Sequence, residues 1–271
     1  MTTASDLLKT EFINAEIGDR LSHVIGKLKS EAFAEVLVFK GKRLEGIFSP
    51  VFATKTNHDI INTKVDKLIR SATCVEKTTA IDEIIRKMIE SDYNALPVKN
   101  NGEVIGVIHI FDLISHVKEK FIKLKIKDIN LQKAFTIKEN EGINKAISIL
   151  HDNSVRALVV LDEKQKPTGA ITHFDIMRNV HLYSHKRDFG QKHGTVSKAF
   201  KGESGHIDAL QVYNFIRYKN EISVSSADLV SNTIKLMIEY KLLNLLVRDT
   251  NSIIRAKTIL RHYNDKVQGN N

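Results

Sequence analysis

Hydrophobic and polar positions alternate along the chain in an order that is repeated four times. In each copy, apolar side chains at helical spacing are followed by two short apolar runs that a turn separates. The helix stripes of the four copies, here called the first to fourth repeats, are Leu21, Val24, Ile25 and Leu28; Ile81, Ile84, Ile85 and Met88; Ile143, Ala146, Ile147 and Leu150; and Val230, Thr233, Ile234 and Met237. This spacing predicts four amphipathic helices.

The runs after each helix carry few polar residues, which is typical of strands covered on both faces. The predicted strands are 36–39 and 44–48, 96–98 and 104–108, 157–161 and 168–171, and 243–247 and 253–254. Asn101-Gly102 between two of them is a hairpin signal. Each repeat is therefore predicted to run strand–helix–strand–strand–helix, an α+β unit. Because one such unit buries too little surface to be stable alone, we expect two pairs.

The helix stripes recur about every 60 residues in the first two steps, and the last step is longer. The predicted boundaries are 1–60, 61–122, 123–184 and 221–271 for the four repeats, and 185–220 for a basic insertion. We expect the helix before the insertion to continue to about Tyr183, and a short helix near 207–218.

Short polar residues precede the predicted helices. Thr79 followed by Asp82, and Ser225 followed by Asp228, resemble capping boxes, and Asp19 comes just before the helix of the first repeat. These pairs predict the N-termini of three helices.

The composition is that of a globular protein. Of 271 residues, 42% are hydrophobic, which is enough for a real core. The charged fraction of 27% is ordinary for a soluble protein. No apolar run approaches the roughly 20 residues that span a bilayer, and the N-terminus lacks the pattern of a signal peptide. Cys74 is the only cysteine, so an internal disulfide is excluded. We therefore expect a cytoplasmic protein that does not associate with membranes.

The formal net charge of +9 favours partners that carry phosphate, including nucleotides and nucleic acid. Enzymatic activity is not expected, because the chain has no Gly-x-Ser-x-Gly, no phosphate-cradling Gly-Lys-Ser/Thr loop and no cysteine pairs. His181 and His185 have the spacing of metal ligands, but no acidic neighbour completes a set. We predict no metal site and no required cofactor.

The family resemblance rests mainly on the segment where the last strand of a repeat leads into the next helix, here called the ending of that repeat. Gly169, Thr172 and Asp175 form Gly-x-x-Thr-x-x-Asp, and Gly106 to Asp112 is a related ending. With the helix stripes and the strand at 96–98, this order resembles the CBS domain family, named after cystathionine β-synthase, over nearly the whole chain outside the insertion. The resemblance implies four domains paired into two modules that stack as a disc. It also implies a regulatory or sensor protein that binds adenosyl ligands such as AMP, ADP, ATP or S-adenosylmethionine and acts on a separate target protein.

In this family the Thr or Ser hydroxyl faces phosphate, and the acid three residues later accepts hydrogen bonds from the ribose. The third repeat has both Thr172 and Asp175. The second has Asp112 with His109, which would donate to phosphate better when protonated. The acid is missing from the endings of the first and fourth repeats, Ser49 to Phe52 and Arg255 to Thr258. We thus expect a stronger site in the third repeat and a weaker one in the second.

The resemblance implies two further contacts with the ligand. Relatives such as the regulatory gamma subunit of AMP-activated protein kinase hold phosphate with His-Arg just before a strand. The matching positions are Asn94-Ala95, Arg156-Ala157, Ala34-Glu35 and Leu243-Asn244, of which Arg156 is the good phosphate ligand, Asn94 is weaker, and the last two pairs supply no cation. The adenine is expected against the first strands, near Thr136-Ile137 and Cys74-Val75.

Other interpretations fit the same residues. Thr172 with Asp175 is also a plain helix cap, and Asp112 would favour a helix dipole wherever it lay. Instead of a nucleotide sensor, the chain could bind nucleic acid through its basic surface and insertion, or be a scaffold whose sites are vestigial. Self-association as a homodimer is compatible with the pattern.

Overall fold

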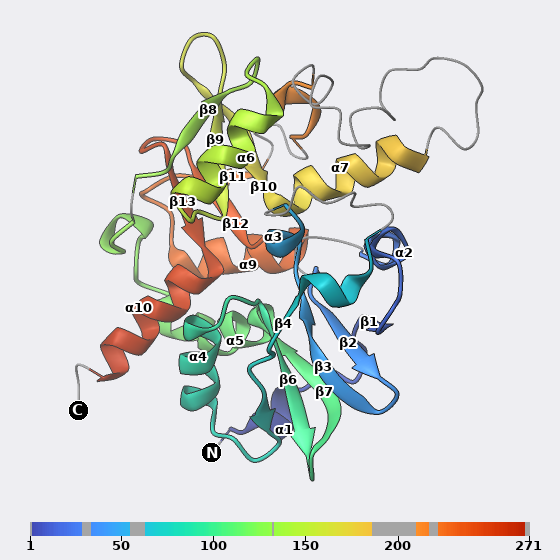
Figure 1. Cartoon of the computed structure of the whole chain (residues 1–271). Coiled ribbons are helices and arrows are strands. Elements are labelled where there is room, and N and C mark those ends of the chain that lie inside the picture. Colours follow the sequence, from blue (N-terminus) through green and yellow to red (C-terminus); the bar gives the residue numbers. More distant parts are fainter. Residues whose placement is uncertain are drawn as a thin grey trace.

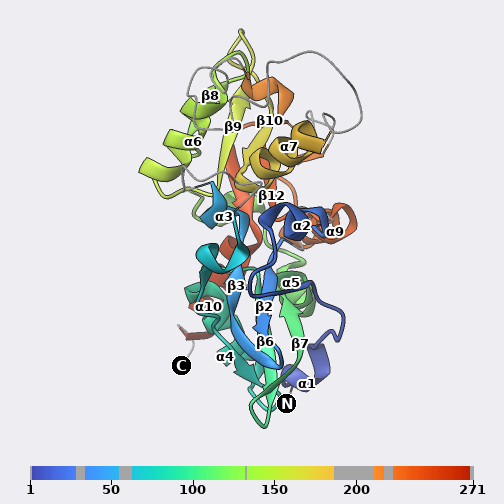
Figure 2. The ribbon, with the colours of Figure 1, turned by 45° about the vertical axis from the view of Figure 1, so that its right-hand side comes forward.

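The computed structural model describes residues 2–28, 34–54, 63–131, 133–185, 210–216 and 222–268. Two lobes lie one above the other, the lower carrying β1 to β7 and the upper carrying β8 to β13 (Figures 1 and 2). Helices from both lobes meet where the lobes join. No helix among the described residues is long and apolar enough to span a membrane.

Each repeat has its own small sheet, and the sheet of the first repeat also takes in residues 69–70, beyond its predicted end at residue 60. The strands are β1 (Asn14–Glu16), β2 (Val36–Lys40), β3 (Arg43–Phe48) and β4 (Ile69–Arg70); β5 (Val75–Glu76), β6 (Ala95–Asn100) and β7 (Glu103–His109); β8 (Thr136–Lys138), β9 (Ala157–Leu161) and β10 (Pro167–Thr172); and β11 (Ser223–Val224), β12 (Asn244–Val247) and β13 (Ser252–Arg255). In every sheet the first strand pairs in parallel with the middle strand, which pairs antiparallel with the next. Asn101 and Gly102, both with positive φ, form the predicted hairpin turn of the second repeat.

The helices follow the predicted stripes. They are α1 (Ala4–Leu7), α2 (Leu21–Gly26), α3 (Pro50–Ala53), α4 (Ile81–Glu90), α5 (Ile110–Val117), α6 (Ile143–Asp152), α7 (His173–His185), α9 (Val230–Tyr240) and α10 (Ala256–Gln268). Short 3₁₀ turns lie at η2 (Val65–Leu68), η3 (Lys118–Phe121), η4 (Ile126–Asp128) and η6 (Val212–Asn214). Of the short helix predicted near 207–218, only η6 and its neighbours are among the described residues. The rest of that prediction, and most of the insertion, lie outside them.

The sheets pack against each other in pairs. Leu37 and Ile47 of the first repeat share an apolar cluster with Val107 of the second. Val159 of the third repeat shares another with Leu246 of the fourth. The predicted α+β fold, with four repeats paired into two modules, is confirmed.

Helices join one module to the other. Ile84 and Ile114 of the second repeat share a core cluster with Ile234 of the fourth. Phe174 and Met177 of the third repeat pack into the core of the first repeat. Burial of one such side chain contributes about 1.5–3 kcal/mol, so these contacts fix how the modules stack. All four repeats therefore surround a common centre.

The predicted capping boxes are wrong in detail. The hydroxyl of Thr79 accepts from the amide of Glu76 at 3.0 Å, and α4 begins only at Ile81. In the fourth repeat the Asp228 carboxylate accepts from the amide of Ser225 at 2.8 Å, and α9 begins at Val230. These side chains close the turn between strand and helix, and the helix starts after that turn. Asp19 closes the same turn in the first repeat by accepting from the amide of Glu16.

The glycine of the repeated ending has a packing reason. The segment before β1 crosses β7, where the Lys9 and Val107 amides donate to each other's carbonyl oxygens at 2.7 and 2.8 Å. A Cβ on Gly106 would lie 2.4 Å from the carbonyl oxygen of Lys9, and one on Gly46 would lie 2.6 Å from that of Arg70. Only glycine lets the backbones approach this closely.

Candidate functional site

The ending of the third repeat is a closed capping arrangement. One oxygen of Asp175 accepts from the Thr172 amide at 3.0 Å and from the Thr172 hydroxyl at 2.7 Å, and the Asp175 amide donates back to that hydroxyl at 3.3 Å. Both side chains are buried. The capping interpretation of this pair is thus realised at the start of α7, and one carboxylate oxygen is engaged by its own helix.

The second repeat has a similar cap at the start of α5. Asp112 accepts from the His109 amide at 3.0 Å, and the ammonium of Lys9 lies 3.8 Å from its other oxygen. Burial, helped by the positive charges of Lys241 and Lys9, lowers the pKa of His109 to about 4. The imidazole is therefore neutral at pH 7, whereas the better phosphate donor expected from the sequence is its protonated form.

The first repeat fills the position of the acid with an aromatic ring. Phe52 is buried and packs edge-on against Tyr93, with ring centroids 6.0 Å apart. The guanidinium of Arg70 lies 5.4 Å from the centroid of the Phe52 ring. This ending offers an apolar and cationic surface in place of a carboxylate.

Equivalent positions of all four repeats meet at one cavity of about 290 Å³, here called the central pocket. The residues just before the strands, Ala34, Asn94, Arg156 and Leu243, all line it. So do the residues at the ends of the later strands in three repeats, Ser49, Thr172 and Arg255. The structure thus brings Asn94, Arg156 and Thr172 together, as three residues of one pocket.

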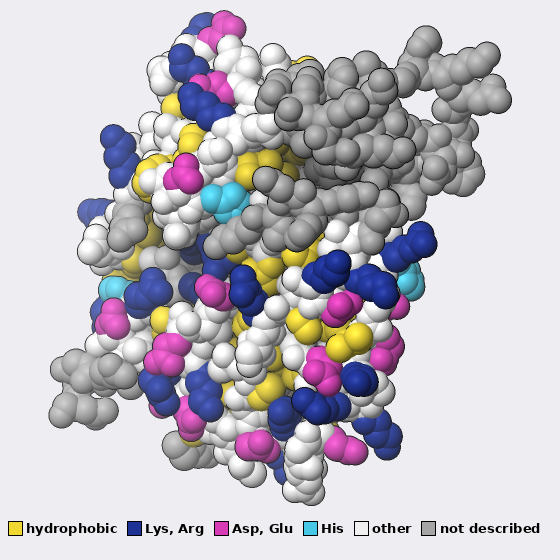
Figure 3. Space-filling model, viewed as in Figure 1, with side chains coloured by type: hydrophobic (Ala, Val, Ile, Leu, Met, Phe, Trp, Pro, Cys, Tyr) yellow, Lys and Arg dark blue, Asp and Glu magenta, His cyan; other side chains and the backbone are white. Residues whose placement is uncertain are grey.

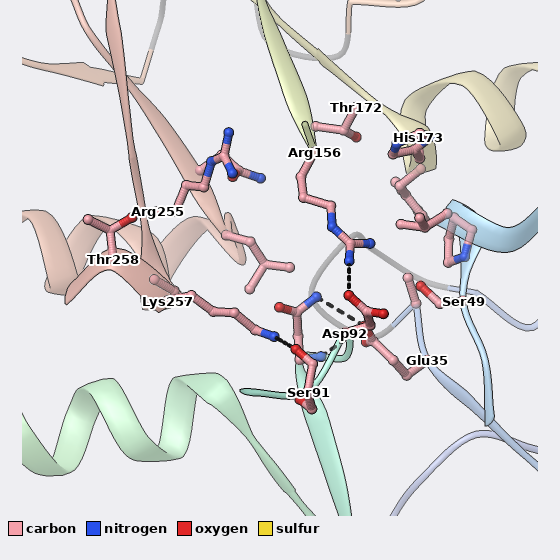
Figure 4. Close-up of a pocket in the computed structure, with 18 of the residues that line it drawn as sticks. Glu35, Ser49, Ser91, Asp92, Arg156, Thr172, His173, Arg255, Lys257 and Thr258 are labelled. Atoms are coloured by element: carbon pink, nitrogen blue, oxygen red, sulfur yellow. Dashed lines mark hydrogen bonds and ion pairs between the residues drawn. The ribbon is translucent and has the colours of Figure 1, made fainter. Parts of the chain in front are cut away.

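Cations enter the central pocket from two repeats (Figure 4). Arg156, just before β9, reaches the Asp92 carboxylate at 2.6 Å. Lys257, near the start of α10, donates to the carbonyl oxygen of Ser91 at 2.6 Å. Arg255 and Arg261 line the same cavity. These side chains make the pocket suitable for an anionic group.

The ammonium of Lys257 is partly deprived of water. Burial lowers its pKa to about 8, with the positive charges of Arg156 and Arg261 adding to the effect and the carboxylates of Glu35 and Asp92 opposing it. Lys257 is therefore mostly charged at pH 7 and mostly neutral at pH 9.

Glu35 is the buried acid of the pocket, with 6% of its surface exposed. Its Oε1 accepts from the Asn94 amide at 3.1 Å and from the Asn94 side chain at 3.0 Å. Its Oε2 is buried and has no hydrogen-bond partner among the described residues. Burial raises the pKa of Glu35, although Asn94 and the charge of Lys257 oppose the rise.

A second cavity of about 320 Å³, here called the outer pocket, lies between the third and fourth repeats. Lys133 and the half-exposed Phe135 form part of its wall. Arg255, Thr258 and Arg261 line both the outer and the central pocket. The fourth ending therefore takes part in two cavities, although it lacks the glycine and the acid.

Several predicted site residues lie elsewhere. Val75 and Ile137 are core residues at 2% exposure, and Thr136 is exposed beside Ile137. All three lie on first strands, which the middle strand of each sheet separates from the ending. They, together with His109, Asp112 and Asp175, are not among the residues that line the central pocket.

Sequence reasoning missed six charged residues of the pocket, namely Glu35, Glu90, Asp92, Arg255, Lys257 and Arg261. A signal for three of them was present. Arg255 and Lys257 stand at the fourth ending, where they were interpreted only as a loss of the family pattern. Glu35 is buried immediately before the apolar strand β2, an unusual place for an acid.

The distribution of charged side chains on the surface is relevant to the nucleic-acid interpretation. On the face shown in Figure 3, Lys and Arg side chains of the described residues are interspersed with Asp and Glu.

Within the described residues, no group of three or more His, Cys, Asp and Glu side chains could hold a metal ion. The side chains of His181 and His185 lie outside the described residues.

Comparison with known proteins identifies the repeats. The model of the CBS domain matches residues 59–119 and 126–182. An uncharacterized protein of Methanocaldococcus jannaschii, MJ1404, is 32% identical over 143 residues, which are 52% of this chain and 32% of that protein. The chain thus spans only about a third of this relative.

Two solved structures share the fold over almost the whole chain. MJ1225 of Methanocaldococcus jannaschii, described as a proposed archaeal homolog of g-AMPK, has a TM-score of 0.76 at 15% identity and covers 95% of this chain and 98% of its own. An uncharacterized conserved protein of Pyrococcus horikoshii has a TM-score of 0.60 at 15% identity, covering 96% and 99%. The segments 59–119 and 126–182 belong to the CBS domain family, and the first and fourth repeats continue the same tandem fold around them.

Proposed function

We propose that this protein is a regulatory nucleotide sensor that binds AMP, ADP or ATP in the central pocket and acts on a separate target protein. The single observation behind the proposal is the convergence of cations from two repeats on one cavity between the modules. No catalytic function is part of the proposal.

The phosphate is assigned to the cationic wall. Arg156 and Arg255 can each offer two N–H groups in a planar fork, the geometry that suits phosphate oxygens. Lys257 adds a third positive charge, and Thr172 lines the same pocket. The cavity volume of about 290 Å³ is near the lower end of ligand pockets, roughly 300 Å³, which suits one mononucleotide.

The family relationship supports the ligand class. The family resemblance implies adenosyl ligands, and the name given to MJ1225 points to the same kind of regulator. The stronger site is assigned to the third repeat, since Arg156 and Thr172 both line the pocket. A weaker site at His109, Asp112 and Asn94 remains a prediction.

Calorimetric titration with AMP, ADP and ATP tests the proposal. Arg156→Met removes a charged donor, which typically contributes about 1.5–3 kcal/mol, so we expect the Kd to rise about tenfold or more. Arg43→Met is the matched control, because Arg43 lies exposed at the start of β3 and pairs with Glu45 at 3.2 Å, and neither residue lines the central pocket.

The outcomes separate the rival functions. If none of the three nucleotides binds the wild-type protein or raises its Tm, the proposal fails. This result would support the interpretation that the protein is a scaffold with vestigial sites. A salt-sensitive mobility shift with RNA or DNA, without nucleotide binding, would favour the nucleic-acid interpretation.

A further inference from the structure

Glu35 is a buried acid in the wall of a pocket that several cations also line. Its side chain is more than nine-tenths buried, and it lines the central pocket together with Arg156 and Lys257. A buried carboxylate oxygen without a partner is costly, because it has lost its hydration and gained nothing in exchange. Such a group in a ligand pocket calls for a specific interpretation.

The neighbouring donors are engaged elsewhere. Arg156 donates to Asp92, and the Lys257 ammonium donates to the carbonyl oxygen of Ser91. Asn94 uses both its backbone and side-chain N–H groups on Oε1 of Glu35. These two bonds hold the carboxyl group in place and leave Oε2 as an acceptor that has no partner among the described residues.

The cationic residues and the acid Glu35 suit different parts of one ligand. A carboxylate repels phosphate, so the phosphate belongs beside Arg255, Arg156 and Lys257. Oε2 of Glu35 requires a hydrogen-bond donor from the same ligand. A ribose phosphate has both features, because its sugar hydroxyls donate while its phosphate is anionic.

We propose that Glu35 recognises the ribose hydroxyls of the nucleotide and selects ribonucleotides over deoxyribonucleotides. This inference rests on the proposed function. It moves to the first repeat a role that the family resemblance assigned to Asp175, whose carboxylate accepts two hydrogen bonds from Thr172 and which does not line the central pocket.

Glu35→Gln is the sharpest test. Because the two donors of Asn94 hold the carbonyl oxygen, the new amide nitrogen takes the place of Oε2 and turns an acceptor into a donor without changing the shape. Hydrogen bonds to charged groups are strong enough that the wild-type protein should bind AMP about tenfold or more tightly than 2′-deoxy-AMP. In Glu35→Gln we expect this ratio to fall towards one.

Two further variants make the result specific. Glu103→Gln, at an exposed position at the start of β7, should leave both affinities unchanged. In Asp175→Asn the preference for AMP should persist, since the asparagine oxygen can still accept from Thr172. Thermal melts show whether each variant is folded. If Glu35→Gln does not fold, the affinities of Asp175→Asn test the inference instead. Loss of the preference for AMP over 2′-deoxy-AMP in Asp175→Asn overturns it.

The remaining outcomes are also decisive. Absence of AMP binding by the wild-type protein overturns the proposed function itself. AMP binding without any preference over 2′-deoxy-AMP overturns only the inference on Glu35. A preference that survives in Glu35→Gln and disappears in Asp175→Asn returns the role to Asp175.

Discussion

Nucleotide binding should weaken between pH 7 and pH 9 because of one lysine. The pKa of Lys257 lies at about 8, so its ammonium is about 90% populated at pH 7 and about 10% populated at pH 9. If the charged form is the one that binds phosphate, the Kd for AMP rises about tenfold over this range. The second pKa of a phosphate group is about 6, so the charge of AMP itself hardly changes there.

The titration of Lys257 does not destabilise the folded protein over this range. The pKa of Lys257 in the folded protein lies below its ordinary value of 10.5, so between about pH 8 and 10.5 the unfolded chain binds more protons. The contribution of Lys257 to the free energy of unfolding therefore rises with pH in that window. The folded protein gains stability from this group while its affinity for the anion falls.

Calorimetry at pH 7, 8 and 9, at constant ionic strength because charge interactions are screened by salt, measures the change. Lys257→Arg keeps its charge over the whole range and should give a flat profile. In Lys257→Met the Kd for AMP should also stay constant with pH, at the weak affinity that the wild-type protein shows at pH 9. A flat wild-type profile, or the same decline in Lys257→Arg, would refute the reasoning.

Two further predictions concern the fold. Gly106→Ala should lower the free energy of unfolding by about 1–3 kcal/mol, because the new Cβ would lie 2.4 Å from the carbonyl oxygen of Lys9, and an unchanged urea midpoint would contradict this. Ile84→Ala should cost about 2–5 kcal/mol, since Ile84 is fully buried in the cluster that joins the second and fourth repeats. Because that cluster belongs to both modules, both should unfold in one shifted transition, and two separate transitions would count against a shared core.

Local structure was predictable wherever near neighbours decide it. The stripe at Ile81, Ile84, Ile85 and Met88 became α4, and all four of its residues are buried. The helix start was misplaced at Thr79, because a short polar side chain closes a strand–helix turn as readily as it caps a helix. One chain segment contains too little information to separate these two uses.

The candidate site was predictable only in part. Arg156, Asn94 and Thr172 reach the central pocket, as the family pattern suggested for phosphate ligands. Thr136 and Val75 do not, because they lie on first strands that the middle strand separates from the ending. The family pattern gives positions within one repeat, whereas the pocket is assembled from four.

The sequence by itself determined the repeats, their strands and helices, and the glycine endings, because the periodicity of apolar side chains and the demands of tight turns act over a few residues. Only the tertiary structure decided which residues share a pocket. Glu35 immediately precedes β2 and Lys257 lies in the first turn of α10, yet both line one cavity. They meet because apolar helix faces of the two modules pack together, and such long-range packing leaves no local pattern in the sequence.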